Sequence, residues 1–255
     1  MKTLLKLAFL FCFLFNFAQA KEIKFIHITD IGLNPKNAYK LQRTIKEIND
    51  YKDIDFVVFG GNNLQKPNFE NLDYFLYLLK KVKKKSYVLL GSNDVSSVSG
   101  LDKEFYLKKV KKARFFKHSK VSNYSFNHKD YVFIVMDGTK QYFQSSNGFY
   151  SKNELDFLDK TLEKNRNKNV IILQHFPLLQ SSSKWLETAK TDEYYQILDK
   201  YKNVKVIISG HYGDNLEIKK DGIYHIITES YSKECAYKVI ELDLEKDYVG
   251  TYLVK

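Results

Sequence analysis

Apolar positions along the first third of the chain alternate between continuous runs and amphipathic stretches. Continuous apolar runs, typical of buried strands, fall at residues 22–29, 54–59 and 87–90. A helix is predicted near residues 37–52, and a second one follows residues 54–59. The inward face of this second helix consists of Phe69, Leu72, Phe75, Leu76 and Leu79. Apolar strands between amphipathic helices indicate a sheet that is covered on both faces.

The rest of the chain is richer in strands. A hairpin is predicted from residues 123–126 and 131–136, and Asp221-Gly222 is a strong turn signal for another. The remaining predicted elements are helices at 152–165 and 192–201 and strands at 170–173, 204–209, 215–219, 223–228, 236–242 and 248–254. This order fits an α/β fold in which two mixed β-sheets pack together and helices flank them.

The first twenty residues have the pattern of a secretory signal peptide. Lys2 and Lys6 precede an apolar stretch at residues 7–17, and Ala18-Gln19-Ala20 forms a cleavage site. The apolar stretch is too short to cross a bilayer, although a retained N-terminal anchor is the alternative. We therefore expect an exported protein, periplasmic or secreted, with one domain at residues 21–255 and no membrane span after cleavage.

The chain is basic, with a formal net charge of +11. A positive surface attracts phosphate-bearing partners or anionic membranes. The densest basic run, residues 80–85, closes a predicted helix, where lysines complement the helix dipole. We interpret it as a solvated face, because no nucleic-acid-binding module is evident.

Loss of the leader leaves Cys235 as the single cysteine, so no internal disulfide can form. It falls in an apparent strand and is interpreted as a small buried hydrophobe.

Five short segments, each at the end of an apolar run, carry the candidate chemistry. Because of this position, their loops are predicted to converge on one edge of a sheet. The segments are Thr29-Asp30-Ile31-Gly32, Gly60-Gly61-Asn62-Asn63, Gly91-Ser92-Asn93-Asp94, Gln174-His175-Phe176-Pro177 and Gly210-His211-Tyr212-Gly213.

In order and spacing, these segments resemble the loops of the calcineurin-like metallophosphoesterases. That family uses an Asp-x-His loop, a Gly-Asp loop, a Gly-Asn-His-Asp loop, a His-x-Pro loop and a Gly-His-x-His loop to bind two metal ions. The resemblance covers nearly the whole mature chain. It implies a sandwich of two mixed sheets, and it implies phosphoester hydrolysis wherever the ligands are kept.

Several positions that the resemblance assigns to the first metal ion are replaced. Asp30 stands where the first aspartate would be, but Gly32 replaces the histidine after it. Asn62 stands at the position of the bridging aspartate, and Gly213 replaces the final histidine. One carboxylate and one neutral amide will not hold a divalent ion well.

The second metal position keeps more of its expected ligands. His175 and His211 are intact, while Ser92 and Asn93 replace the asparagine ligand and the histidine near the leaving group. Asp94 is kept, although its implied role is to orient the missing histidine. Two imidazoles with a hydroxyl or an amide could hold a single Zn²⁺, Mn²⁺ or Fe²⁺ ion.

The sequence thus predicts a protein that has lost two-metal catalysis and acts by binding, with no metal or at most one divalent ion. Its partner is unknown, and a phosphate-bearing ligand or another protein are both open. The alternative is a single-metal phosphoesterase acting on a phosphate mono- or diester, with His175, His211 and solvent as ligands. Such an enzyme could also recruit Asn63 or Asp214.

Other polar residues receive structural interpretations. Asp137 is interpreted as a turn residue at a strand end, and Asp30 could equally cap a loop or helix. Four histidines are interpreted as structural side chains: His27, His118, His128 and His225.

Overall fold

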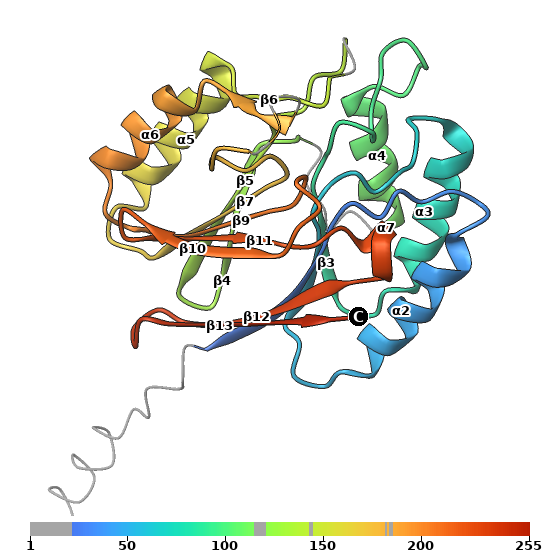
Figure 1. The fold of residues 1–255 in the computed structure, drawn as a ribbon, viewed down its shortest axis with the longest axis horizontal. Helices are drawn as coiled ribbons and strands as arrows, with labels where there is room; N and C mark the ends of the chain where they lie inside the picture. The colour runs from blue at the N-terminus through green and yellow to red at the C-terminus, as the bar shows by residue number, and fades with distance from the viewer. Residues whose placement is uncertain (1–21, 115–120, 143–144, 182, 184–185) are drawn as a thin grey trace, which may run out of the picture.

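The computed structural model describes residues 22–114, 121–142, 145–181, 183 and 186–255. Two β-sheets lie face to face with helices on both outer sides (Figure 1). The predicted α/β sandwich of two mixed sheets is therefore confirmed. The predicted signal peptide at residues 1–20 lies outside the described residues. No helix in the described ranges is long and apolar enough to cross a membrane.

The first sheet has five strands in the order β13-β12-β1-β2-β3. Its central strands run parallel, and β12 and β13 add an antiparallel edge. The strands are β1 (Ile23–Ile28), β2 (Phe56–Phe59), β3 (Lys85–Val88), β12 (Tyr237–Asp243) and β13 (Tyr248–Val254). All four residues of β2 are buried, as its continuous apolar run predicts.

The second sheet has six strands in the order β10-β11-β9-β7-β5-β4. Four parallel strands form its centre, and β10 and β4 are antiparallel edges. The strands are β4 (Tyr124–His128), β5 (Tyr131–Met136), β7 (Val170–Gln174), β9 (Val204–Ser209), β10 (Leu216–Lys220) and β11 (Ile223–Ile227). A separate short pair, β6 (Gly148–Phe149) with β8 (Thr188–Ala189), lies beyond β5.

Helices cover the outer face of each sheet (Figure 1). The five-stranded sheet carries α2 (Ala38–Asp50), α3 (Phe69–Lys81) and α4 (Lys103–Ala113). The six-stranded sheet carries α5 (Lys152–Lys164) and α6 (Thr191–Lys200). A single helical turn, α7 (Tyr231–Glu234), connects β11 to β12.

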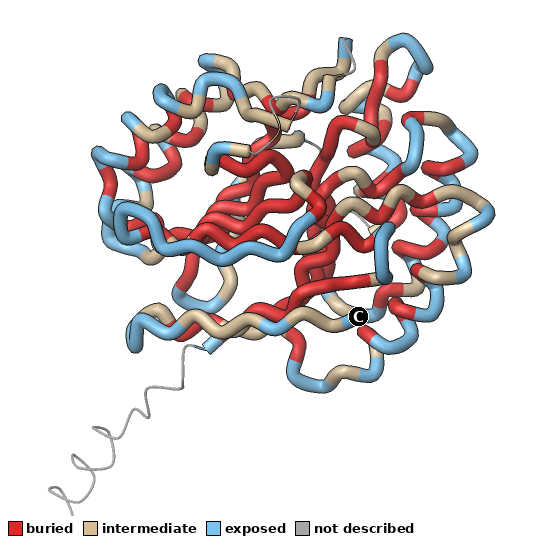
Figure 2. The backbone as a smooth tube through the Cα atoms, viewed as in Figure 1, coloured by how far each residue is buried: buried red, intermediate tan, exposed pale blue. Residues whose placement is uncertain are grey.

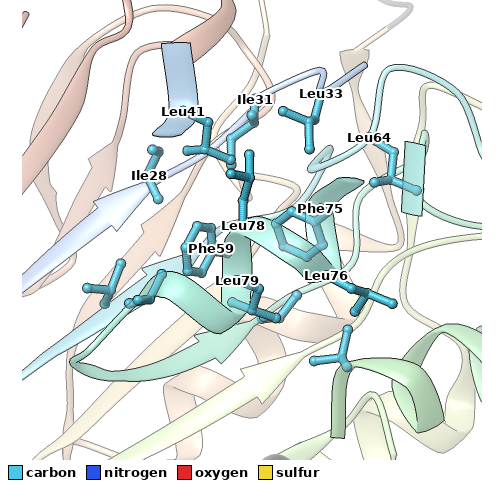
Figure 3. Close-up of a cluster of buried hydrophobic side chains, with 14 of the residues drawn as sticks. Ile28, Ile31, Leu33, Leu41, Phe59, Leu64, Phe75, Leu76, Leu78 and Leu79 are labelled. Atoms are coloured by element: carbon cyan, nitrogen blue, oxygen red, sulfur yellow. The ribbon is translucent and has the colours of Figure 1, made fainter. Parts of the chain in front are cut away.

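The core has three layers, one between the sheets and one under each group of helices. Figure 2 shows buried backbone concentrated in the strands of both sheets. Between the sheets, Phe25 stacks on Phe56 at 4.8 Å and meets Phe133 edge-on at 5.8 Å between ring centroids. Under α3, Phe59 meets Phe75 at 5.6 Å (Figure 3). Burying such rings contributes most of the favourable free energy of folding.

Two features of the fold depart from the sequence-based expectations. No helix was predicted at α4, although its buried residues Tyr106, Leu107 and Val110 have the i, i+1, i+4 spacing of one helical face. The assignment of Cys235 to a strand was wrong. It follows α7 with a left-handed φ of 60°, one residue before the buried run of β12, and is half-buried.

Candidate functional site

The five singled-out segments meet at the C-terminal ends of the parallel strands. Residues 29–32 follow β1, 60–63 follow β2 and 91–94 lie just beyond β3, whereas 174–177 and 210–213 close β7 and β9. The predicted convergence of the loops is confirmed. Three of the loops follow strands of the five-stranded sheet and two follow strands of the six-stranded sheet, so the site lies at the edges of two sheets rather than of one. Backbone hydrogen bonds connect neighbouring loops, from Asp30 N to Gly61 O at 2.9 Å and from Gly210 N to His175 O at 3.1 Å.

The loops hold an unusual backbone geometry at three of their polar residues. Asp30, Asn62 and His211 have φ values of 53°, 50° and 71°, in the left-handed region that side chains other than glycine seldom adopt. Gly61 has a φ of 96°, and a Cβ there would lie 2.7 Å from Nδ1 of His175. Such conformations cost about 1–3 kcal/mol each, so the surrounding packing must fix these turns firmly.

Asp30 and Asn62 are hydrogen-bonded directly to each other. Nδ2 of Asn62 donates to Oδ1 of Asp30 at 2.9 Å. The orientation of the amide is not arbitrary, because Oδ1 of Asn62 accepts from the backbone N–H of Asn93 at 2.9 Å. A backbone N–H can only donate, so the NH₂ group must face Asp30.

The second carboxylate oxygen of Asp30 is also occupied. Oδ2 accepts from Oγ of Thr29 and from the backbone N–H of His211, both at 2.9 Å. Both oxygens that could have faced a first metal ion therefore accept hydrogen bonds from the protein. Gly32 and Gly213 have no side chains to contribute, so the residues present do not fit an ion at this position.

His175 is buried, with 1% of its surface exposed. Its Nδ1 lies 2.8 Å from the carbonyl oxygen of Gly60 and must carry a proton, because a carbonyl only accepts. Its Nε2 lies 3.8 Å from Oδ1 of Asp30. Nε2 has no hydrogen-bond partner among the described residues.

His211 lies beside His175, with 5.1 Å between the ring centroids. Burial, together with the nearby His175 ring, lowers the pKa of His211 to about 4, so the ring is neutral at pH 7. Backbone groups of Ser146 and Leu186 lie near the ring and oppose this lowering of the pKa, but neither ring nitrogen has a hydrogen-bond partner of standard geometry within the described part of the chain. Buried polar atoms without partners are uncommon, and they mark this position as one that could accept a ligand.

A single divalent ion fits this second position only in part. His175 and His211 supply imidazole nitrogens, the donor type that Zn²⁺ prefers. Ser92 and Asn62 add only a hydroxyl and an amide, and Oγ of Ser92 donates to Oδ1 of Asn62 at 3.3 Å. Within the described ranges, no group of three or more His, Cys, Asp and Glu side chains is placed to hold a metal ion.

Asp94 and Asn63 lie together beneath the site. Asp94 is fully buried and accepts from the backbone N–H groups of Gly91 at 2.8 Å and Leu64 at 2.9 Å. Burial raises the pKa of Asp94 to about 7. Nδ2 of Asn63 donates to Leu89 O at 2.9 Å and lies 3.2 Å from Oδ2 of Asp94. Asp94 therefore braces the loops, and Asn63 is held within this network.

The other alternative ligand, Asp214, is directed elsewhere. Its carboxylate lies 3.4 Å from Nζ of Lys233, and its side chain is 78% exposed. Lys233 in turn donates to Gly213 O at 2.7 Å. The structure does not bring Asp214 to the two histidines.

The turn at α7 is a part of the site that the sequence did not predict. The backbone N–H groups of Tyr231 and Ser232 donate to Thr29 O at 3.0 Å and to Asp30 O at 3.1 Å. Oγ of Ser230 also donates to Asp30 O, at 3.2 Å. A four-residue helix has too few positions for a periodic pattern, so only the structure shows that it clamps the first loop.

The remaining polar predictions have mixed outcomes. His27 and His225 are buried in strands, and His128 lies 3.2 Å from Asp55. His118 lies outside the described residues. Asp137 does form a turn, because Oδ1 accepts from Thr139 N at 2.9 Å, but its other oxygen lies 2.7 Å from Nζ of Lys103.

Two relatives of this chain are named as cyclic nucleotide phosphodiesterases. A 3′,5′-cyclic adenosine monophosphate phosphodiesterase of Haemophilus influenzae is 23% identical over 239 residues, covering 86% of this chain and 82% of that protein. A probable cyclic nucleotide phosphodiesterase of Ruthia magnifica is 28% identical over 81 residues, covering 31% of this chain and 35% of that protein.

The fold is also found in solved structures. A dimetal phosphatase of Danio rerio has a TM-score of 0.68 at 14% identity, covering 91% of this chain and 98% of its own. The inner membrane complex anchor GAP50 of Plasmodium has a TM-score of 0.59 at 15% identity, covering 92% of this chain and 84% of its own. The family model of the calcineurin-like phosphoesterases matches residues 23–213. The chain therefore belongs to the calcineurin-like phosphoesterase family.

Proposed function

We propose that this protein binds a phosphate-bearing ligand at the loop site and has lost two-metal phosphoester hydrolysis. The observation that carries this proposal is the hydrogen bond between Asp30 and Asn62. It joins two side chains that, in a two-metal centre, would both point toward cations. Its fixed orientation leaves the amide NH₂ group, rather than an ion, as the partner of the carboxylate.

The electrostatics support the same reading. Two-metal hydrolysis needs a shared carboxylate to hold two dications close together. At the shared position Asn62 is neutral. Asp30 is therefore the carboxylate of the five segments that contacts the other loops, through Asn62 and His211. Asp94 is buried below and accepts hydrogen bonds from backbone N–H groups.

The names of the curated relatives suggest the class of ligand. Both are described as cyclic nucleotide phosphodiesterases, so we propose a nucleotide or a related phosphate ester. The basic chain favours an anionic ligand. A ring nitrogen without a proton and a phosphate oxygen are both hydrogen-bond acceptors, so a contact between them needs one added proton. With that proton, the ring nitrogens of His175 and His211 could hydrogen-bond to phosphate oxygens.

A single-metal phosphoesterase is the second candidate, and the same ring nitrogens favour it. His175 and His211 would hold the ion, and a bound ion of this kind polarises a phosphoryl oxygen. Burial keeps His211 neutral at pH 7, as a metal ligand must be. The protein's own contribution would be to hold the two rings in place, through Gly60 O for His175.

Hydrolysis and binding of cyclic AMP, each measured with and without added Mn²⁺, separate the two candidates. Our proposal predicts binding without turnover in both conditions. Mn²⁺-dependent turnover that the double variant His175→Ala/His211→Ala abolishes would establish the single-metal enzyme instead. A variant with Gly32→His, Asn62→Asp, Ser92→Asn and Gly213→His restores the four replaced metal ligands and tests whether the loops can regain Mn²⁺-dependent turnover, although Gly32 and Gly213 have left-handed φ values that a side chain strains.

Export is a separate proposal, supported by the pattern of residues 1–20. The mass of the protein recovered from its native cell tests it. A mature chain that begins at residue 21 is expected, whereas an intact leader on all of the recovered protein would contradict cleavage.

A further inference from the structure

A hollow next to the loop site, at the C-terminal end of β5, is not used by the proposed function. Its volume is about 510 Å³. Pockets for small molecules fall in the range of about 300–1,000 Å³ and are mostly apolar with a few polar groups. The side chains that matter here are Lys103, Asp137, Lys140, Tyr142, Phe149 and Glu154.

The acidic groups of the hollow already have partners. Asp137 is 4% exposed, and its Oδ2 lies 2.7 Å from Nζ of Lys103 on α4. Oε2 of Glu154 accepts from the backbone N–H of Ser151 at 2.9 Å, as part of the capping box that starts α5. Asp137 is therefore paired with a cation, whereas the Glu154 carboxylate is held by neutral donors at the N-terminus of α5.

Lys140 is the charge that remains available. It forms no ion pair with a carboxylate in the described ranges, and its Nζ lies 5.5 Å from the centroid of the Phe149 ring. Nζ of Lys190 lies 5.7 Å from the same ring, but it is paired with Glu193 at 3.3 Å. Tyr142 is 70% exposed. The hollow thus places the ammonium of Lys140 beside aromatic surface.

We propose that this hollow binds a small planar aromatic molecule that carries a negative charge, of the size of a nucleoside monophosphate. The ring of the ligand would lie against Tyr142 and Phe149, and Lys140 would pair with its anionic group. Aromatic rings favour stacked or edge-on contacts with flat ligands, and a half-exposed ammonium pairs well with an anion. This proposal does not depend on ligand binding at His175 and His211.

The hollow lies next to the loop site in the fold. Gly138 follows Asp137, and a Cβ at Gly138 would lie 3.0 Å from the ring of Phe176, the neighbour of His175. Oγ of Thr139 donates to Leu90 O at 3.2 Å, at the start of the loop that carries Ser92. A test must therefore separate binding in the hollow from binding at the two histidines.

Three probes make this separation by calorimetric titration of the purified protein. Adenosine 5′-monophosphate has both a ring and a charge, adenosine has only the ring, and ribose 5-phosphate has only the charge. We expect the first to bind most tightly, and ribose 5-phosphate to bind at least about tenfold more weakly, because stacking of a base on an aromatic side chain has about this effect. Equal affinity for the two phosphates, or no binding of adenosine 5′-monophosphate at millimolar concentration, would overturn the proposal.

Variants locate the binding. Tyr142→Ala is expected to weaken adenosine 5′-monophosphate and adenosine by about tenfold each. Lys140→Ala should weaken both charged probes and leave the binding of adenosine unchanged. Tyr39→Ala is the matched control, because Tyr39 is 69% exposed on α2, and it should bind as the wild type does.

The double variant His175→Ala/His211→Ala should bind adenosine unchanged. Loss of adenosine binding in it, or unchanged binding in Tyr142→Ala, would place the ring elsewhere and overturn the proposal.

Discussion

Asn62 donates a hydrogen bond of 2.9 Å to Asp30, and the backbone N–H of Asn93 fixes the direction of that bond. The two side chains project from loops after β1 and β2, which are adjacent parallel strands. Asp30 therefore has a neutral hydrogen-bond donor where a two-metal enzyme would present it with a cation. Asp30 and Asn62 both have left-handed φ values, so two tight turns hold the contact in place.

Replacing Asn62 with aspartate should destabilise the protein at neutral pH. Asn62→Asp would place two carboxylates in the contact that now joins an amide to Asp30, with a cost of about 1–3 kcal/mol in the free energy of unfolding. Added Mn²⁺ should restore part of the loss, because a cation compensates paired carboxylates. Thermal unfolding with and without Mn²⁺ measures both effects. Asn167→Asp, which adds the same charge at an exposed position, should show neither.

Removing the charge of Asp30 should weaken the loop site. Its carboxylate accepts from Thr29, Asn62 and His211, whereas an amide would turn its NH₂ group toward one of these donors. We expect Asp30→Asn to lower the free energy of unfolding by about 1–3 kcal/mol, measured by urea titration. Asp214→Asn removes a carboxylate that is 78% exposed, and it should cost less than about 1 kcal/mol. Equal costs for the two variants would show that the Asp30 network contributes nothing.

The ion pair between the two sheets gives a third prediction. Nζ of Lys238 on β12 is fully buried and lies 2.6 Å from Oε1 of Glu217 on β10, whose side chain is 46% exposed. Glu217→Gln leaves the buried ammonium without its charge partner and should cost about 1–3 kcal/mol, because solvent reaches the glutamate side of the pair. Lys238→Met replaces it with an apolar side chain and should be neutral or stabilising. Urea unfolding of both variants tests the prediction, which fails if Lys238→Met is the more destabilising change.

Stability should fall in mild acid, in part because of His225. Burial lowers the pKa of His225 in the folded protein to about 4, whereas the unfolded side chain keeps a value near 6.5. Between these values the unfolded state binds more protons, so stability decreases as the pH falls from 6.5 toward 4.

The titration of His225 lowers the free energy of unfolding by about 2 kcal/mol between pH 7.5 and pH 5. A His225→Phe variant should therefore lose less stability over this range than the wild type does. The measurement is the change in the free energy of unfolding between the two pH values. Equal changes in both proteins would contradict the assignment.

The fold was predictable because its signals are strong and periodic. The continuous apolar runs of β1, β2, β7 and β9 indicate buried strands, and their ends indicate where the loops meet. The helix α4 was missed although its apolar residues recur with a helical period, so this signal was present in the sequence. The turn at α7 was missed because four residues contain about one helical turn and no repeat.

The candidate site was predictable in its residue types but not in its contacts. The sequence indicates that Asn62 replaces a carboxylate, yet the bond to Asp30 depends on two left-handed residues and on Asn93. The role of Lys103 beside Asp137 is also tertiary, since it depends on where α4 packs. Such contacts join loops far apart along the chain, and no local pattern encodes them.

The number of metal ions bound per chain tests the central claim most directly. Purified protein is offered Mn²⁺, Zn²⁺ and Fe²⁺, desalted and analysed by elemental mass spectrometry, with the His175→Ala/His211→Ala variant treated in parallel. We predict at most one ion per chain, absent from the double variant, because the Asp30–Asn62 contact closes the first position. Two ions per chain would contradict the loss of the two-metal centre.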